Sequence, residues 1–387
     1  MSRELIYLDY HSTTPVDTRV ANAVFQAMIT TFGNASSVEH EAGDCAESAV
    51  KQSAYYVSEL IQAAPREVTF TSGTTESINI AIQGTVKHAQ KSGVTPHIAI
   101  SVIEHKAVLD TCYALKSQGQ IKLTVLPVDN QAHVDLLELE QVCASGIHLL
   151  CVMAANNEVG TIYPIEKISA IAQNHNVPFL CDATQAVGKI PIRFRAWGIT
   201  MLALSAHKFY GPKGIGALVV RKGYQLAPIL YGGGQQKALR PGTLNVPGIV
   251  GLGEACRLRQ IEMVEDERAI AAKRDRLQSK LLANIPGLII NGDTQNRLAG
   301  NLHISAPDIP NSAIIARVRH YLAISTGSAC SSGVETPSHV LTAMRLKEEV
   351  IEGALRIGLG KFTTDEEIEA AAQILIAETR AIRKLLE

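Results

Sequence analysis

The sequence predicts an α/β fold in which a mostly parallel seven-stranded sheet lies between helices and a smaller α+β domain follows. Three observations predict it. Short apolar runs alternate with longer helix-compatible stretches from about residue 65 to 220, which is typical of strand-helix units around a parallel sheet. Polar residues follow five of these runs, and a long charged stretch over 254–284 then leads towards the smaller domain.

The composition excludes several classes of protein. A chain of 387 residues with 46% hydrophobic and 19% charged residues can bury a large core and divide into two or three domains. The formal net charge of -1 argues against direct binding of nucleic acid or of an anionic membrane. The N-terminus lacks a secretory apolar core, and no apolar run is long enough to span a bilayer.

The seven cysteines are scattered and form no Cys-x-x-Cys pair. This spacing disfavours a disulfide framework and a structural zinc site, and it fits a reducing compartment. We therefore expect no metal, and we expect the protein in the cytoplasm.

The apolar runs predict seven strands, over 67–71, 97–101, 121–126, 147–153, 177–182, 199–204 and 216–221. Ligands of open α/β sheets bind outside the carboxyl ends of the strands. The polar groups that follow five strands should therefore meet in one crevice; they are residues 72–76, 104–105, 156–158, 183–185 and 205–208.

The C-terminal part predicts a second domain. Apolar residues at helical spacing over 254–284 indicate a long bridging helix. Strand-like pieces follow at 300–305 and 354–359, and Thr364 with Glu367 forms a capping box that opens the last helix. We expect a large domain over 14–257 and a small domain over 1–13 and 258–387.

Lys208 is the central candidate residue. It comes just after the apolar run 199–204, with Ser205 and His207 close before it. A lysine can condense with an aldehyde, and the hydroxyl and imidazole can face an anion, so the pattern favours pyridoxal phosphate (PLP) as cofactor. Asp182 ends another buried strand and could sit beside a pyridinium nitrogen. The alternative is an ordinary surface lysine, as most lysines are.

A second group of residues points to the phosphate. Thr74 and Thr75 follow a predicted strand and precede a helix-compatible run, so the backbone N–H groups there should lie at a helix N-terminus and favour an anion. An ordinary helix cap is the alternative interpretation.

Three further residues follow strand ends. His105 suits a ring that stacks on a planar cofactor and moves protons. Asn157 and Gln185 are amides that can donate to a cofactor oxygen or to a carboxylate, with loop-capping amides as the alternative.

Arg356 and Cys330 are candidates from the C-terminal part. Arg356 lies in an apolar strand-like run, so it needs an anionic partner, either the carboxylate of an amino-acid substrate or an internal salt bridge. Cys330 lies in a Gly/Ser-rich loop, at about 325–337, that cannot pack a core. We expect this loop to be mobile and to carry a reactive thiol.

These residues resemble the cysteine desulfurases of the NifS/IscS type, which belong to the fold-type I PLP enzymes. The Ser-Ala-Cys context with its extended loop is similar to group I of that family. The matching motifs are residues 7–10 with 13–15, 71–77, 104–108, 156–160, 182–185, 207–214, 242–243 and 327–330.

The resemblance implies a role for each matching residue. Lys208 would bind PLP, Asp182 would pair with the pyridine nitrogen, His105 would stack on the ring, and Cys330 would accept the sulfur. Asn157 and Arg356 would bind the substrate carboxylate, and Gln185 would contact the phenolic oxygen. The phosphate would be held by Thr74, Thr75, Ser205, His207 and, from the other subunit of a homodimer, Thr243.

The implied activity is conversion of L-cysteine to L-alanine, with the sulfur passed through a Cys330 persulfide to an acceptor such as an iron-sulfur scaffold protein. Members that serve iron-sulfur assembly continue past the last helix, whereas this sequence stops at Glu387, so we expect scaffold docking to differ.

Two alternatives stay open at this point. One is another PLP enzyme, such as an aminotransferase or a selenocysteine lyase. The other is a non-catalytic sulfur-assembly or nucleotide-binding module, in which residues 211–214 would form a phosphate loop; they lack the spacing of that motif.

Overall fold

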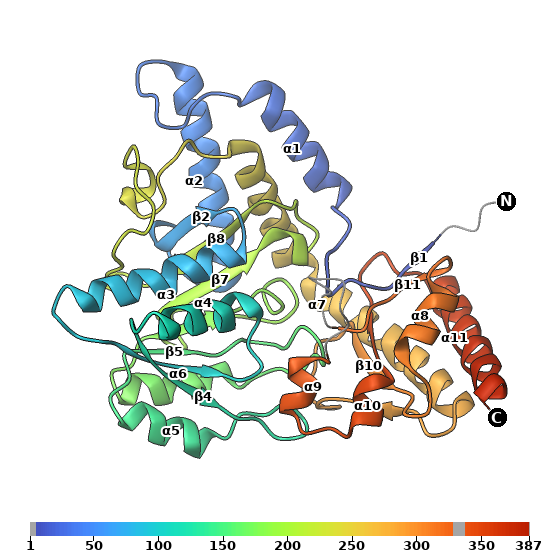
Figure 1. Cartoon of the computed structure of the whole chain (residues 1–387). Helices are drawn as coiled ribbons and strands as arrows, with labels where there is room; N and C mark the ends of the chain where they lie inside the picture. Colours follow the sequence, from blue (N-terminus) through green and yellow to red (C-terminus); the bar gives the residue numbers. More distant parts are fainter. Residues whose placement is uncertain (1–4, 328–336, 387) are drawn as a thin grey trace.

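The computed structural model describes residues 5–327 and 337–386. It has a large part built on a sheet and a smaller part that contains both described chain ends (Figure 1). The fold predicted from the sequence is confirmed: a mostly parallel seven-stranded sheet between helices, with a smaller α+β part.

All seven predicted strands are present and form one sheet. They are β2 (Val68–Thr71), β3 (His97–Ser101), β4 (Lys122–Leu126), β5 (Leu149–Cys151), β6 (Phe179–Asp182), β7 (Met201–Ser205) and β8 (Gly216–Val220). Their order across the sheet is β2-β8-β7-β6-β5-β3-β4. Only β8 runs against its neighbours, and β2 on its far side again runs parallel to β7. The carboxyl ends of the other six strands therefore share one edge.

Both faces of the sheet are buried, and successive residues of a strand alternate between them. Ile98 and Ile100 of β3 pack into one core with helices α3 and α4. Ala99, between them, packs into the core on the opposite face, which also contains residues of α2, α5, α6 and the first half of α7. The sequence therefore shows a continuous apolar run, and not an alternating one, for central strands such as β5 and β6.

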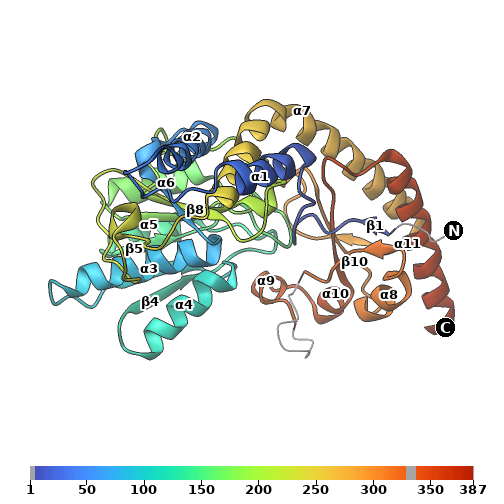
Figure 2. The ribbon, with the colours of Figure 1, turned by 90° about the horizontal axis from the view of Figure 1, so that it is seen from above.

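The helices of the large part lie on both faces of this sheet (Figures 1 and 2). They are α1 (Thr18–Thr30), α2 (Glu41–Ile61), α3 (Thr74–Gln90), α4 (Lys106–Ser117), α5 (Leu136–Ala144) and α6 (Ile165–Asn174). Short 3₁₀ turns lie at Pro65–Glu67, Ala206–Lys208 and Gln235–Ala238.

Helix α7 (Val246–Asn284) connects the two parts (Figure 2). Leu252 and Cys256 in its first half pack into the core of the large part, and Leu277 and Leu281 in its second half pack into the core of the small part. The predicted start at residue 254 was wrong. Asn245 caps the helix by accepting from the Gly248 N–H at 3.1 Å, and Pro247 lies in the first turn, which is a recognisable helix start.

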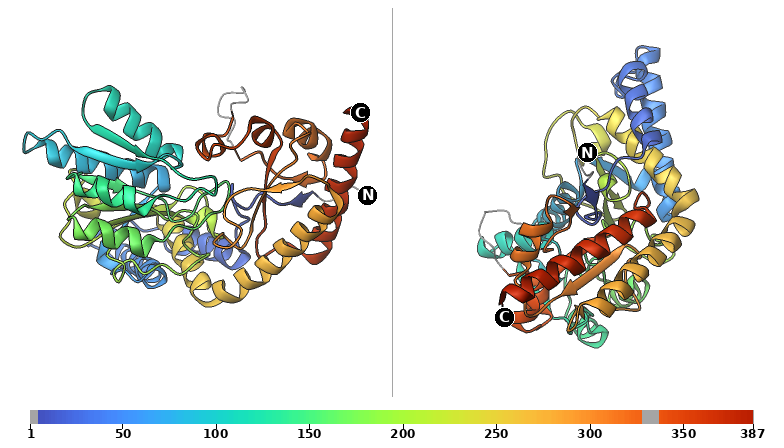
Figure 3. Two further views of the ribbon diagram at one scale, coloured as in Figure 1. Left: turned by 90° about the horizontal axis from the view of Figure 1, so that it is seen from below. Right: turned by 90° about the vertical axis from the view of Figure 1, so that its right-hand side faces the viewer.

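The small part contains an antiparallel sheet covered by helices (Figure 3). Its sheet has the order β12-β10-β9. The elements are β9 (Ile289–Ile290), β10 (Asn301–Ser305), α8 (Asn311–Val318), β11 (Leu322–Ala323), α9 (His339–Ala343), α10 (Glu348–Glu352), β12 (Ala354–Gly358) and α11 (Asp365–Leu386). The capping box before α11 is confirmed: Glu367 accepts from the Thr364 N–H at 2.8 Å, and the Thr364 hydroxyl accepts from the Glu367 N–H at 3.1 Å.

The N-terminal segment packs with the small part. Strand β1 (Ile6–Tyr7) pairs in parallel with β11, and Leu8 is fully buried in the small part's core. The chain then crosses to the large part, where the Thr14 N–H donates to the His207 carbonyl at 2.9 Å. The division at residues 14 and 257 itself stays a prediction.

Two glycines test how tightly this fold is packed. Gly160 and Gly119 both have a positive φ, 79° and 68°. A Cβ on Gly160 would lie 2.4 Å from Asn301 Cγ, whereas a Cβ on Gly119 would meet nothing within 4 Å. We expect Gly119→Ala to lower the free energy of unfolding by about 1 kcal/mol, and Gly160→Ala to lower it by a further 1–3 kcal/mol or so. Urea unfolding followed by fluorescence measures both; equal losses would contradict this packing.

Candidate active site

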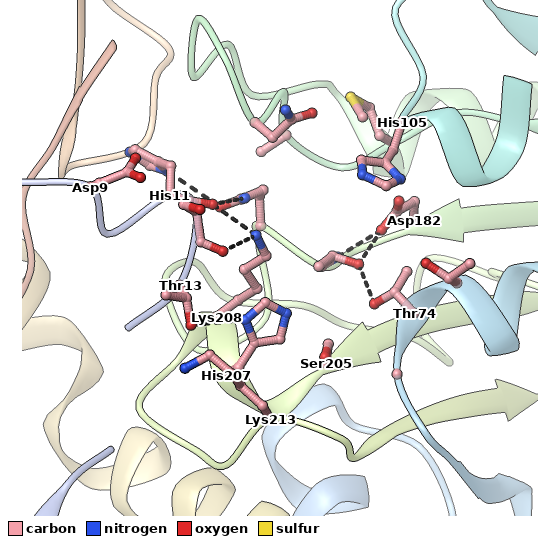
Figure 4. Close-up of a pocket in the computed structure, with 18 of the residues that line it drawn as sticks. Asp9, His11, Thr13, Thr74, His105, Asp182, Ser205, His207, Lys208 and Lys213 are labelled. Carbon is pink, nitrogen blue, oxygen red and sulfur yellow. Dashed lines mark hydrogen bonds between the residues drawn. The ribbon is translucent and has the colours of Figure 1, made fainter. Parts of the chain in front are cut away.

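A cavity lies at the edge of the main sheet where its parallel strands end. It has a volume of about 740 Å³. Loops after β2, β3, β5, β6 and β7 line it, together with the N-terminal segment and residues of the small part (Figure 4). Ten of the twelve predicted site residues line it: Thr74, Thr75, His105, Asn157, Asp182, Gln185, Ser205, His207, Lys208 and Arg356.

Lys208 projects into this cavity from the short 3₁₀ turn that follows β7. Its Nζ donates to the carbonyl oxygens of His11 at 2.8 Å and Ser12 at 2.7 Å (Figure 4). Burial, reinforced by the nearby cations of Lys189 and Arg356 and partly opposed by Asp182 and Asp9, lowers the pKa of Lys208 to about 7. A large share of this amine is therefore unprotonated, and nucleophilic, at neutral pH.

Asp182 ends β6 and is 5% exposed. Its carboxylate accepts from the backbone N–H of Thr184 at 3.0 Å and from the Thr184 hydroxyl. Because that hydroxyl donates to Asp182, it accepts from the Thr74 hydroxyl, 2.7 Å away. Thr184 therefore links the carboxylate to the N-terminus of α3, a role that the sequence did not indicate.

His105 caps helix α4. Its Nδ1 accepts from the Ala107 N–H at 3.1 Å, so the neutral ring carries its proton on Nε2. Burial lowers the pKa of His105, and the Lys208 cation acts in the same direction while Asp182 opposes it. The ring lies near Asp182 (Figure 4).

The first turn of α3 faces the cavity through Thr74 and Thr75. Ser205 and His207 line the cavity from the end of β7. Gly216 permits the loop of Gly73 and the end of β7 to approach each other closely. A Cβ on Gly216 would lie 2.8 Å from Gly73 Cα and 2.4 Å from the Leu204 carbonyl oxygen. Burial lowers the pKa of His207 to about 4. The α3 N-terminus supplies N–H groups suited to an anion.

Arg356 reaches the cavity from β12 of the small part. Its Nη2 donates to Asp9 at 3.0 Å and its Nη1 to the Asn157 carbonyl at 3.1 Å. Its Nε is buried and has no hydrogen-bond partner within the described residues. The internal salt bridge is therefore the arrangement seen here, with donor capacity left over.

Gln185 already uses both ends of its amide. Its Nε2 donates to the His11 carbonyl at 2.8 Å, and its Oε1 accepts from Lys189 Nζ at 2.8 Å. Contact with a cofactor oxygen would rely on the remaining N–H of this amide.

Two predicted residues are not among the described residues that line the cavity. Thr243 is exposed in the loop before α7, and Cys330 lies outside the described residues. Gly327, the last described residue before Cys330, lines the cavity. After Cys330, the Ser338 hydroxyl donates at 2.5 Å to Glu158, which follows the cavity residue Asn157.

The N-terminal segment also contributes residues to the site, and these were not predicted from the sequence. Asp9, His11, Ser12 and Thr13 all line the cavity. The polar run directly after the apolar Tyr7 and Leu8 was the available signal, but nothing local shows that it reaches Lys208.

The family of this chain follows from comparison with known proteins. The aminotransferase class-V family matches residues 6–371. A cysteine desulfurase IscS of Anaeromyxobacter sp. (strain Fw109-5) is 40% identical, over 98% of this chain and 94% of its own length. The mitochondrial cysteine desulfurase of Arabidopsis thaliana is 39% identical, over 98% of this chain and 83% of its own length.

A solved structure of a NifS-like protein superposes with a TM-score of 0.90 at 33% identity, covering 98% of this chain and 100% of that one. The similarity therefore extends over both parts of the fold.

Glu104, just before His105, allows the effect of burial on a carboxyl pKa next to the site to be tested. It is fully buried, and it accepts from the Ser101 hydroxyl at 2.7 Å and the Met153 N–H at 2.8 Å. Burial raises its pKa to about 8. Between about pH 5 and 8 the unfolded chain has lost this proton and the folded chain keeps it, so the stability contributed by Glu104 is lost as the pH rises.

We expect Glu104→Gln to remove this dependence. The free energy of unfolding of the variant should fall less than that of the wild type from pH 5 to pH 8, by about 1 kcal/mol or more. Urea titrations at several pH values measure it. Parallel pH profiles for the two proteins would show that Glu104 ionises normally.

Proposed function

This chain belongs to the aminotransferase class-V family, and from its active site we propose which residues carry out its reaction. It is a PLP-dependent cysteine desulfurase, which converts L-cysteine to L-alanine and passes the sulfur to a cysteine of the enzyme. The observation that carries this conclusion is a half-buried lysine near a buried aspartate, in a chain that is 40% identical to a cysteine desulfurase over 98% of its length.

The cavity residues fit PLP. An unprotonated Lys208 amine suits its aldehyde, and the Asp182 carboxylate suits a protonated pyridine nitrogen. The α3 N-terminus, with Thr74, Thr75, Ser205 and His207, suits its phosphate. When bound, PLP supplies an electron sink for the negative charge that forms at the substrate α-carbon.

Lys208 and His105 are the residues we propose for proton transfer. With a pKa of about 7, the Lys208 amine can take the α-proton of the substrate and return it at neutral pH. The neutral His105 ring carries an N–H on Nε2 and can donate that proton to a developing charge. Asp182, held by Thr184, would supply the carboxylate that pairs with the protonated ring nitrogen.

Arg356 and Asn157 are proposed to bind the substrate carboxylate. The guanidinium has five N–H groups. Within the described residues, Nη1 donates to the Asn157 carbonyl and Nη2 to Asp9. The buried and unpartnered Nε would gain a charge-assisted hydrogen bond from the bound amino acid.

Cys330 is proposed to accept the sulfur. Its thiolate attacks the substrate sulfur, so that a sulfur-sulfur bond forms as the substrate carbon-sulfur bond breaks. The electron pair of the broken bond stays on the carbon fragment, which takes up protons and leaves as alanine. Gly327, three residues earlier in the sequence, lines the cavity.

We propose that the protein is a homodimer in which Thr243 serves the partner's cavity. Thr243 is exposed and does not line the cavity of its own chain. Several large apolar side chains are also exposed on α1 and the following loop, which favours a covered surface there: Phe25, Met28, Ile29, Phe32 and Val38.

The sulfur acceptor and the compartment are also proposals. We propose an acceptor protein such as an iron-sulfur scaffold, and a location in the cytoplasm. The six cysteines in the described part of the chain are all free thiols, which is consistent with a reducing compartment. Among the described helices, none is long and apolar enough to cross a membrane.

Lys208→Ala tests the proposed role of the lysine. We expect the purified variant to lose its visible cofactor absorption after gel filtration, and alanine formation from L-cysteine to fall at least about 100-fold. Lys167→Ala, which removes an exposed lysine from α6, should retain both. Normal alanine formation by Lys208→Ala would contradict the proposal.

Cys330→Ala separates sulfur transfer from cofactor binding. We expect the variant to keep its cofactor absorption but to show no protein-bound persulfide by mass spectrometry after incubation with L-cysteine. Cys45→Ala is the control for loss of a thiol elsewhere, because Cys45 is an exposed free thiol. A persulfide that persists in Cys330→Ala would assign sulfur transfer to another cysteine, and an aminotransferase would be unaffected by the change.

A further inference from the structure

Lys189 is a partly buried lysine close to the active site that has no role in the reaction described above. It does not line the cavity, and it lies one helical turn's spacing after Gln185. Its side chain is partly buried, and its Nζ donates to Gln185 Oε1 at 2.8 Å. It therefore stands behind the cavity wall, with the amide of Gln185 between it and the site.

The contact with Lys189 fixes the orientation of the Gln185 amide. A lysine ammonium is only a donor, so the Gln185 atom that faces it must be the oxygen. The other end gives the same answer independently, since the His11 carbonyl, 2.8 Å from Nε2, is only an acceptor. His11 Nδ1 lies 3.3 Å from the same Oε1, so it must be the donor there.

The His11 carbonyl is shared between two donors. It accepts from Gln185 Nε2 and also from Lys208 Nζ, each at 2.8 Å. A carbonyl oxygen has two lone pairs, and these two contacts use both. Gln185 thus helps to position the His11 carbonyl that accepts from Lys208. Lys189 in turn fixes the orientation of the Gln185 amide.

We propose that Lys189 is a positioning residue for Lys208, which acts through Gln185 and the His11 carbonyl and which places a fixed positive charge behind the reactive amine. This inference rests on the proposed function, in which Lys208 is the reactive group. It adds to that function a residue that touches neither substrate nor cofactor.

The charges around the two lysines support this role. Lys189 and Arg356 both lower the pKa of Lys208, whereas Asp182 and Asp9 raise it. Burial lowers the pKa of Lys189 itself to about 8, with Glu267 opposing and Arg259 and Arg356 reinforcing the shift, so Lys189 remains mainly charged at neutral pH. Three imidazoles also interact electrostatically with this group of lysines; they are His11, His105 and His207.

The test is the titration of the Lys208 amine in the full chain after removal of the cofactor. Trace labelling with acetic anhydride from pH 5 to pH 10, followed by mass spectrometry of the peptide that contains residue 208, gives the midpoint. For Lys189→Met, which loses the donor and the charge, we expect the midpoint to rise by about one pH unit, so that labelling at pH 7 slows roughly fivefold.

Three further variants complete the experiment. Lys189→Gln, which keeps a polar side chain but loses the charge, should raise the midpoint in the same direction and serves if Lys189→Met does not fold. Lys189→Arg keeps charge and donors and should titrate like the wild type. Lys167→Met is the matched control for loss of an exposed lysine and should leave the midpoint unchanged.

A folded Lys189→Met or Lys189→Gln protein with the wild-type midpoint would overturn the proposal, as would a Lys189→Arg midpoint as high as that of Lys189→Met. A second measurement on the holoenzyme, the pH titration of its visible absorption, should shift in the same direction. Labelling requires neither L-cysteine nor turnover, so a failure of the proposed activity would leave this result readable, and the reverse also holds.

Discussion

The common direction of six strands in one sheet is the constraint on which the active site depends. Strands β2, β3, β5, β6 and β7 all end at the same edge, so that residues more than a hundred positions apart in the sequence meet there. The single reversed strand β8 makes this possible for β2, because it separates β2 from β7 while leaving the two parallel. Gly216, at the start of β8, lacks the Cβ that would separate the loop of Gly73 from β7.

The balance of charge at this edge determines what the central lysine can do. Two cations, Lys189 and Arg356, and the loss of solvent all act against a positive charge on Lys208, and Asp182 and Asp9 only partly offset them. A lysine in bulk water would be protonated at neutral pH and unable to attack an aldehyde. The same environment that makes the amine nucleophilic also makes it able to carry a proton in both directions.

Much of this could be predicted from the sequence, for physical reasons that also define where prediction stopped. The strands β3, β6 and β7 are buried on both faces, so each is largely apolar, and the polar residues after them indicated His105, Asp182 and Lys208. The strands β1, β9 and β11 have two residues each, which is too short for any periodicity. The true start of α7 was missed, although Asn245 and Pro247 form a recognisable helix-start signal.

Long-range partners were the other limit. Asp9 and Arg356 are far apart in the sequence and pair through a tertiary contact, which no local pattern encodes. Gln185 was predicted as a site residue and lines the cavity, but its amide is engaged by His11 and Lys189, and only the folded chain reveals this. The role of Cys330 rests on sequence and on its neighbours, since it lies outside the described residues.

The N-terminal segment connects the small part, the large part and the active site. Strand β1 holds it to the small part, Thr14 holds it to the large part, and between them lie Asp9 and the carbonyls of His11 and Ser12. Asp9 is the ion-pair partner of Arg356. The residue proposed to bind the substrate carboxylate and the reactive amine are therefore both held by one short stretch of backbone, because Asp9 lies two residues before the carbonyl that restrains Lys208.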